Sequence, residues 1–286
     1  MFFILQDDKE FDKMDVDMLV LKQELQKQRM LHEYTTQSIH YFDADVHYSS
    51  KINMKEAVPV GSIDFVGQYL KQIHGIDNMN PIEVPNELRM DKFLCRDYRI
   101  VGVDELPQKG YYFIKDVSQL KQFTYTGEVS YLFYDGVFDE PKRFDTRLHL
   151  NPNHLFEVSE VVNILSEYRV FISEDKIKGI QFYDGDPTIM PTPDEINKLQ
   201  EAVIRYSVNP TRPRAYALDI AVIKTKTDIG RDLMIIESCP FASLGLYGLV
   251  GSFLPYMYRD GIDWYIKHNT KIQKYRNTET QNKKGE

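Results

Sequence analysis

Two acidic residues, Asp219 and Glu237, lie in segments that the sequence predicts to be the two strands of a β-hairpin. Between them, Thr227-Asp-Ile-Gly230 is typical of a turn, because Asp caps through its side chain and Gly accepts a positive φ. An antiparallel pair turning near Asp228 places the two acids roughly opposite each other. Like charges so placed are destabilising unless a cation lies between them. The pair therefore either holds a hard cation such as Mg²⁺ with phosphate oxygens of a substrate, or forms two solvated carboxylates at strand ends.

The residues beside Asp219 alternate as expected for a strand with one crowded and one open face. Ala217 and Ala221 lie on the face of Asp219 and leave room there. The opposite face carries apolar residues that can pack into a core, namely Leu218, Ile220 and Val222.

Cationic residues occur earlier in the chain, at the ends of predicted strands. Lys115 ends an apolar strand, and Lys121 follows in a stretch that closes at Gly127. A lysine after a strand is usually a solvated boundary residue, but two in such a stretch could hold polyphosphate oxygens as point charges. Glu167 and Arg169 share one face of a later strand. They form an intrastrand ion pair, or Glu167 directs the Arg169 guanidinium toward a transferring phosphoryl group or acyl phosphate.

The order Lys, Lys, Glu-x-Arg, Asp, Glu resembles the ATP-grasp superfamily, and specifically its divergent clade with one Arg and two Lys. That clade includes phage and bacterial predicted ligases and the eukaryotic cell-division-cycle proteins that assemble a translation initiation factor. The resemblance covers about residues 105 to 250, with a weaker echo at Gly61-Ser-Ile-Asp-Phe65. The matching stretches are Phe113-Ile-Lys115, Lys121-Gln-Phe-Thr124, Ser166-Glu-Tyr-Arg-Val-Phe-Ile172, Leu218-Asp-Ile220 and Ile236-Glu-Ser-Cys-Pro-Phe-Ala-Ser-Leu-Gly-Leu-Tyr-Gly248.

The resemblance implies that ATP is bound with Mg²⁺ by particular residues of this chain. Lys115 and Lys121 would contact the ATP phosphates, and Glu167 would support this site. Arg169 would lie by the γ-phosphate and, with Lys121, take part in catalysis. Asp219 and Glu237 would hold Mg²⁺.

The same resemblance places the adenine at the hinge between two lobes, which here should be Leu155-Phe-Glu-Val-Ser159. Backbone groups of Val158 and Ser159 would read the edge of the base. Glu157 would add a polar contact. The sequence contains no P-loop pattern and no kinase-type Gly-rich loop, so another type of phosphate cradle is not indicated.

One residue departs from the family pattern. Cys239 stands two residues after the metal-binding Glu, where the family usually has Asn, and a thiol is a poor ligand for a hard cation. The expected activity is that of an ADP-forming carboxylate–amine ligase acting through an acyl phosphate, on a peptide or protein or on other unknown carboxylate and amine substrates. The alternative is a non-catalytic ATP-binding assembly or chaperone-type factor. Cys239 as a nucleophile has no support, since its neighbours are apolar.

The predicted fold is α/β (α+β), an ATP-grasp fold with two lobes closing on ATP. An N-terminal α/β region would cover 1–105, and the ATP-grasp domain would cover 106–265, with lobes at about 106–160 and 161–265. The remaining residues, 266–286, are polar and are expected to be a solvated or disordered tail. Helices are predicted after Ser62, as an N-cap, and after Thr192-Pro-Asp-Glu195, which has the pattern of a capping box.

Composition narrows the class of protein. The 286 residues carry a net charge of −8 and an isoelectric point of about 5.5, which argues against nucleic acid and anionic membranes as partners. Two cysteines are typical of a reducing compartment, and the start lacks the features of a signal peptide. We therefore expect a cytoplasmic protein, in the host cell if a phage encodes it. The seven histidines show no zinc-binding spacing.

Overall fold

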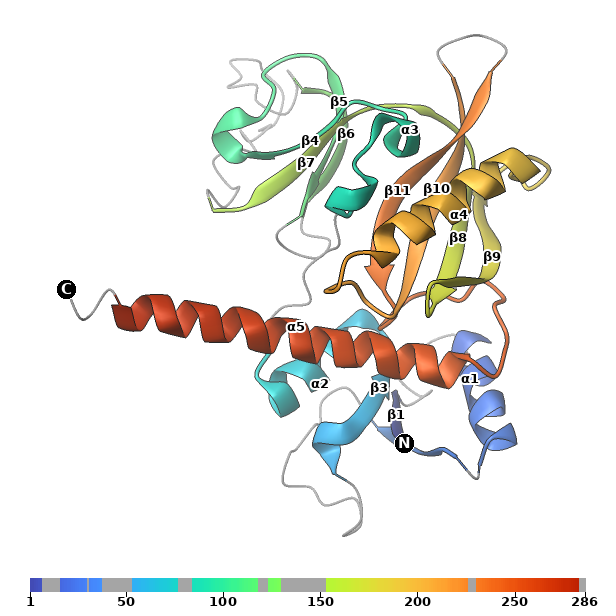
Figure 1. Cartoon of the computed structure of the whole chain (residues 1–286), viewed down its shortest axis with the longest axis vertical. Helices are drawn as coiled ribbons and strands as arrows, with labels where there is room; N and C mark the ends of the chain where they lie inside the picture. The colour runs from blue at the N-terminus through green and yellow to red at the C-terminus, as the bar shows by residue number, and fades with distance from the viewer. Residues whose placement is uncertain are drawn as a thin grey trace, which may run out of the picture.

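The structure is a computed structural model that describes residues 1–6, 16–29, 31–37, 53–76, 84–117, 123–129, 153–225 and 230–282. Three β-sheets organise these residues, and helices pack against them (Figure 1). The Lys121 position and most of the turn around Asp228 lie outside the described ranges.

The N-terminal sheet is parallel, with strand order β2-β1-β3. Its strands are β1 (Phe2–Gln6), β2 (Glu33–Gln37) and β3 (Ala57–Val60), and its helices are α1 (Val16–Lys27) and α2 (Ile63–His74). The central strand β1 has fully buried apolar residues on both faces, as expected for a parallel strand covered by helices. This sheet and its helices form one core with the start of the C-terminal helix.

The second sheet is antiparallel, with strand order β4-β7-β5-β6. Its strands are β4 (Tyr98–Gly102), β5 (Tyr111–Asp116), β6 (Thr124–Glu128) and β7 (Leu155–Glu160). Strand β4, which precedes the expected boundary at residue 105, pairs along its whole length with β7. Only local turn residues separate β4 from β5, so no break in composition marks where this sheet begins.

The third sheet carries the predicted acids and arginine of the site, Glu167, Arg169, Asp219 and Glu237. It is antiparallel with strand order β11-β10-β8-β9, built from β8 (Asn163–Ser173), β9 (Lys176–Gly185), β10 (Ala215–Lys224) and β11 (Arg231–Pro240). Helix α4 (Pro193–Ser207) covers one face, and the apolar residues of β10 pack beneath it as the sequence predicts. The opposite face is left for Asp219 and its neighbours.

Both predicted helix starts are confirmed. The Ser62 hydroxyl accepts a hydrogen bond from the Phe65 backbone N–H at the beginning of α2. Thr192 and Glu195 form a reciprocal capping box at the start of α4, with Pro193 in the first turn. These caps satisfy backbone donors that a helix leaves without partners. The shorter helices are η2 (Met54–Glu56), η3 (Asn86–Leu88), α3 (Asp91–Leu94) and η4 (Val103–Glu105).

The C-terminal helix α5 (Leu254–Asn282) crosses the molecule, and it contacts β10, α1 and β3 (Figure 1). The segment from residue 266, expected to be a polar tail, belongs to this helix as far as Asn282. Buried residues such as Met257 and Ile262 anchor its first turns. Once nucleated, a helix propagates readily through Lys, Gln, Glu and Arg. Among the described residues, no helix combines the length and apolar character that crossing a membrane requires.

Candidate nucleotide and metal site

Asp219 and Glu237 are direct partners across the β10–β11 pair, which confirms the predicted hairpin register. The pairing shifts immediately after Asp219, because Ile220 lies opposite Ile235. Ile236 is therefore an extra residue on β11, a β-bulge, and it changes which side chains of that strand face Asp219. As a result Glu237 and Met234 share the face of Asp219, although their spacing of three residues would separate them on a regular strand.

Arg169 on β8 binds Asp219 directly. Its Nε donates to Asp219 Oδ1 and its Nη2 to Asp219 Oδ2, both at 2.7 Å. Arg169 is 9% exposed and Asp219 is 3% exposed. This bidentate pair results from strand register, since the two residues are cross-strand partners in the β8–β10 ladder.

The predicted pairing of Glu167 with Arg169 was wrong. Glu167 accepts a hydrogen bond from the Tyr183 hydroxyl on β9, while Asp219 holds both sides of the guanidinium. The carboxylate on the next strand lies directly opposite the guanidinium, whereas residues two apart on one strand are farther from each other. Tyr183 also stacks with Tyr247 at 5.2 Å between ring centroids. The Arg169 guanidinium lies over both rings, 5.2 Å from that of Tyr247 and 5.8 Å from that of Tyr183.

Lys115 reaches this site from the second sheet. Its Nζ lies 2.9 Å from Glu237 Oε2 and 3.7 Å from Glu157 Oε2. Lys115 and Glu157 are cross-strand partners on β5 and β7, whereas Glu237 belongs to the third sheet. Lys115 therefore connects the second and third sheets at the candidate site.

Arg96 is a residue that the sequence reasoning missed. Its side chain is 4% exposed, and its Nη2 lies 3.3 Å from Glu157 Oε1. Its Nη1 donates to the Ile235 carbonyl at 2.9 Å. Arg96 thus fastens β11 to β7 on the far side of Glu157 from Lys115. It lies in a short segment between α3 and β4 without periodicity, so only its charge could have drawn attention to it.

The charges of the site influence one another strongly. Burial raises the pKa of Asp219, and Glu237 adds to this effect, while Arg169 opposes it. Burial would also raise the pKa of Glu237, but Lys115 and the other hydrogen-bond donors around it hold that pKa below its ordinary value. Burial lowers the pKa values of Lys115 and Arg169, but their carboxylate partners outweigh it and raise both. Both cations therefore remain charged at neutral pH.

A cavity of about 660 Å³ lies next to the segment that joins β7 to β8. Residues 160–163, from the end of β7 to the start of β8, line it together with Arg96 and the end of β10 near Ile223. This volume lies in the range of small-molecule and cofactor pockets. Because Arg96 also contacts Glu157, the cavity is adjacent to the charged cluster.

The predicted adenine-reading residues lie just before this cavity. Val158 and Ser159 belong to β7, which pairs with β4 on one side and β5 on the other. Their backbone groups therefore lie within two sheet ladders, and both residues are buried. The chain lies outside these strands only at residues 161–162, between β7 and β8. Glu157 is also buried, and Arg96 and Lys115 engage it. The backbone outside the ladders that lies nearest the predicted hinge is therefore at 161–162.

The two carboxylates fit Mg²⁺ as far as their chemistry is concerned, since hard cations prefer oxygen ligands. Asp219 keeps lone pairs free for an ion while it binds Arg169, because a carboxylate has about four acceptor positions. The third nearby donor is the Cys239 thiol, which does not suit a hard cation. Asp219 and Glu237 would hold the ion, whose chemistry at this place is to neutralise phosphate charge.

Comparisons with known proteins agree with this architecture. A family model matches residues 93–252, and it describes an ATP-grasp domain, family 2 of the clade with one Arg and two Lys. A search of curated proteins returned no match. The solved D-alanyl-alanine synthetase A from Vibrio cholerae is similar at a TM-score of 0.50 and 11% identity, over 92% of this chain and 98% of that chain.

Two further solved structures are similar at lower TM-scores. The macrocyclase MdnC from Microcystis aeruginosa MRC, bound with precursor peptide MdnA, has a TM-score of 0.46 and 12% identity, over 91% of this chain and 98% of that chain. The D-alanine–D-alanine ligase from Bacillus anthracis has a TM-score of 0.46 and 11% identity, over 96% and 99%. The family match spans more than half of the chain and includes the charged cluster. The protein therefore belongs to the ATP-grasp superfamily, in family 2 of the clade with one Arg and two Lys.

Proposed function

We propose that this protein is an ATP- and Mg²⁺-dependent ligase that joins a carboxylate to an amine and releases ADP and phosphate. One observation supports this most strongly. Two cations and two carboxylates, contributed by two different sheets, form one continuous chain of contacts: Arg169, Asp219, Glu237 and Lys115. A polyphosphate with its metal ion is a ligand that needs both signs of charge in one place.

The nucleotide would lie along the line from the hinge cavity to the charged cluster. Residues 161–162 would contact the adenine, and Lys115 and Arg169 would contact phosphate oxygens. Lys121 remains part of the proposal as a second phosphate-binding lysine, and it lies outside the described residues. Glu167 would act through Tyr183, which keeps the aromatic pair beside Arg169 in place.

The proposed chemistry has two displacement steps. An oxygen of the substrate carboxylate attacks the γ-phosphorus, and the bond to the ADP oxygen breaks, which gives an acyl phosphate and ADP. The amine then attacks the acyl carbon, phosphate leaves, and the nitrogen loses a proton to form the amide. The protein mainly positions the reactants and stabilises charge. Arg169 is suited to this role because Asp219 fixes its orientation on a rigid strand.

We place the acceptor beside the aromatic pair of Tyr183 and Tyr247. Tyr247 is 44% exposed and lies in a loop that the N-terminal region holds, since Leu246 N–H donates to Asp17 and the Ser243 hydroxyl donates to the Gly61 carbonyl. An exposed aromatic wall next to Arg169 can bind part of a substrate larger than an amino acid. This supports a peptide or protein acceptor, which is also what the resemblance to the clade implies.

A second candidate function is a nucleotide-binding assembly factor without turnover. Cys239 favours it, because the thiol occupies a place beside Glu237 where an oxygen ligand would complete a Mg²⁺ site. Such a protein would bind ATP between the lobes but would not transfer its phosphate.

Release of ADP stimulated by mixed carboxylate and amine substrates, including peptides, distinguishes the two functions. For a ligase we expect ADP release that depends on both substrates and is lost in Lys115→Met. Lys176→Met, which removes an exposed lysine on the third sheet, is the matched control and should retain activity. Tight Mg·ATP binding without any stimulated ADP release would argue for the assembly factor. Absence of ATP binding would contradict both functions.

A further inference from the structure

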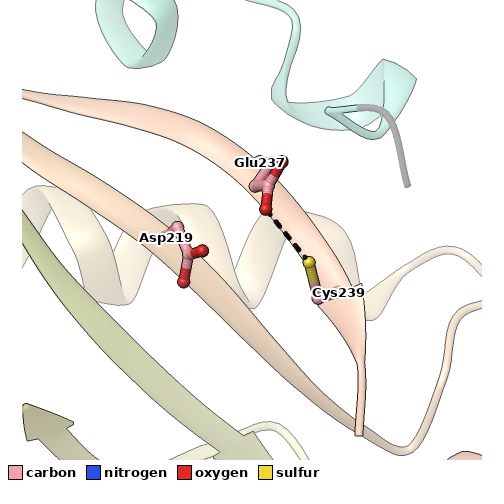
Figure 2. Close-up of side chains that lie close together, drawn as sticks. All are labelled: Asp219, Glu237 and Cys239. Atoms are coloured by element: carbon pink, nitrogen blue, oxygen red, sulfur yellow. Dashed lines mark hydrogen bonds between the residues drawn. The ribbon is translucent and has the colours of Figure 1, made fainter. Parts of the chain in front are cut away.

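A third potential ligand lies beside the two acids. Asp219, Glu237 and Cys239 each offer one donor atom, and these atoms all lie within 4.8 Å of one another. Figure 2 shows the three side chains on the neighbouring strands β10 and β11. Glu237 and Cys239 share a face because they are two residues apart on β11. Ala217 pairs with Cys239 across the strands.

The two oxygens of Glu237 have different partners. Oε2 lies 2.9 Å from Lys115 Nζ, whereas Oε1 accepts a hydrogen bond from Cys239 Sγ at 3.4 Å, the contact drawn as a dashed line in Figure 2. The proton of that hydrogen bond lies between a sulfur and an oxygen. A metal ion that displaces it would bind both atoms, since metal ligands must be deprotonated.

Lys115 need not prevent an ion from binding to Glu237. Glu157 is 1% exposed, and its Oε2 is buried without a hydrogen-bond partner among the described residues. This oxygen lies 3.7 Å from Lys115 Nζ. A small shift would therefore transfer Lys115 to Glu157 and release Glu237 Oε2, while satisfying a buried acceptor that otherwise remains unpaired.

We propose that this site binds a borderline divalent transition ion, such as Zn²⁺ or Co²⁺, in preference to Mg²⁺, with Cys239 as a thiolate ligand. The proposal rests on the proposed function, in which an ion at this place serves ATP. Thiolate ligands favour Zn²⁺ and related ions, whereas Mg²⁺ requires oxygen ligands in near-octahedral geometry. On binding, the Sγ–H bond breaks, a bond from Sγ to the metal forms, and the proton passes to solvent.

Titration of the protein with Co²⁺ alone, and again with a non-hydrolysable ATP analogue, tests the proposal. A sulfur–cobalt charge-transfer band in the near ultraviolet is expected in the parent protein and in Cys95→Ser. Cys95→Ser is the matched control, since Cys95 is the other cysteine of the chain. The band should be absent in Cys239→Ser, with Co²⁺ affinity reduced by more than about ten-fold, the lower limit for loss of even an indirect contact to a metal. A band that persists in Cys239→Ser, or none in the parent, would overturn the proposal.

A second measurement avoids any change at Cys239. In Cys95→Ser, a metal-bound Cys239 should react with iodoacetamide at least about ten times more slowly in Zn²⁺ than in the same concentration of Mg²⁺, as expected when a thiolate is coordinated. Equal rates would contradict the proposal.

The two hypotheses fail differently. If Mg·ATP binds and turns over while Co²⁺ gives no band, only the thiolate ligand is refuted. If neither ion supports ATP binding, the proposed function itself is refuted.

Discussion

Replacing Asp219 with Asn should destabilise the fold because it leaves Arg169 without a negative partner inside the protein. Both residues are at least nine-tenths buried, so water screens their interaction little. The substitution keeps one acceptor oxygen but removes one of two charge-assisted hydrogen bonds at 2.7 Å and the ionic attraction. Loss of one partner of a buried pair costs about 3–5 kcal/mol, and the retained acceptor reduces this to about 2–4 kcal/mol.

Urea unfolding at pH 7 measures this cost through the midpoint of the transition. The matched control is Asp175→Asn, which removes the acid from the Arg212 ion pair at the surface. Asp175 has a positive φ of 60°, a conformation that Asn also tolerates. Exposed pairs contribute about 0–1 kcal/mol, so the control should shift the midpoint much less than Asp219→Asn does.

The double variant Asp219→Asn/Arg169→Met separates the two physical causes. If an unpaired buried charge dominates the cost, removing it should make the double variant more stable than the sum of the single effects predicts. Equal destabilisation by Asp219→Asn and Asp175→Asn would refute the reasoning. So would strict additivity in the double variant.

Two further predictions concern neighbouring parts of the molecule. Arg96→Met should remove the arginine partner of Glu157, a buried charge beside the hinge cavity. Calorimetry should show ATP binding weakened by about ten-fold, the equivalent of 1.4 kcal/mol. Unchanged affinity would exclude Arg96 from the site. Burial raises the pKa of Glu195, but hydrogen bonds from Arg231 and Thr192 bring it below its ordinary value of 4.5. The ionised Glu195 should therefore contribute fully to the free energy of unfolding above about pH 4.5, and this contribution should disappear as the pH falls further. The urea midpoint of Glu195→Gln should lie below that of the parent at pH 7 and approach it at pH 3. An equal difference between the two midpoints at both pH values would contradict this.

The elements that the sequence predicted best have strong local signals. The capping box at Thr192 and the N-cap at Ser62 are properties of a few adjacent residues, and both are confirmed. The hairpin register was predictable because turn residues lie midway between Asp219 and Glu237. Alternation on β10 likewise predicted which residues pack beneath α4. Local chemistry determines these features, so no distant contact was needed to infer them.

The features that the sequence could not predict depend on contacts between distant segments. The bulge at Ile236 changes which side chains of β11 face Asp219. The apolar residues around Ile236 give no sequence signal for a bulge. Glu167 was expected to hold Arg169 because the two lie on one strand, but Tyr183 on the neighbouring strand supplies its partner. Arg96 becomes significant only when β11 and β7 come together. The long helix α5 is anchored by contacts with β10, α1 and β3. The composition of residues 266–286 alone does not indicate these contacts.

The most direct test of the central claim is a calorimetric titration of ATP with and without saturating Mg²⁺, under conditions in which each variant is folded. Asp219 and Glu237 face each other beside Lys115 and Arg169, so an ion held there should link the protein to the triphosphate. We predict metal-dependent binding by the parent and by Asp175→Asn, and binding weakened by about ten-fold or more in Asp219→Asn, since 1.4 kcal/mol corresponds to a factor of ten. Equal affinity of all three proteins for ATP, with or without Mg²⁺, would contradict the account.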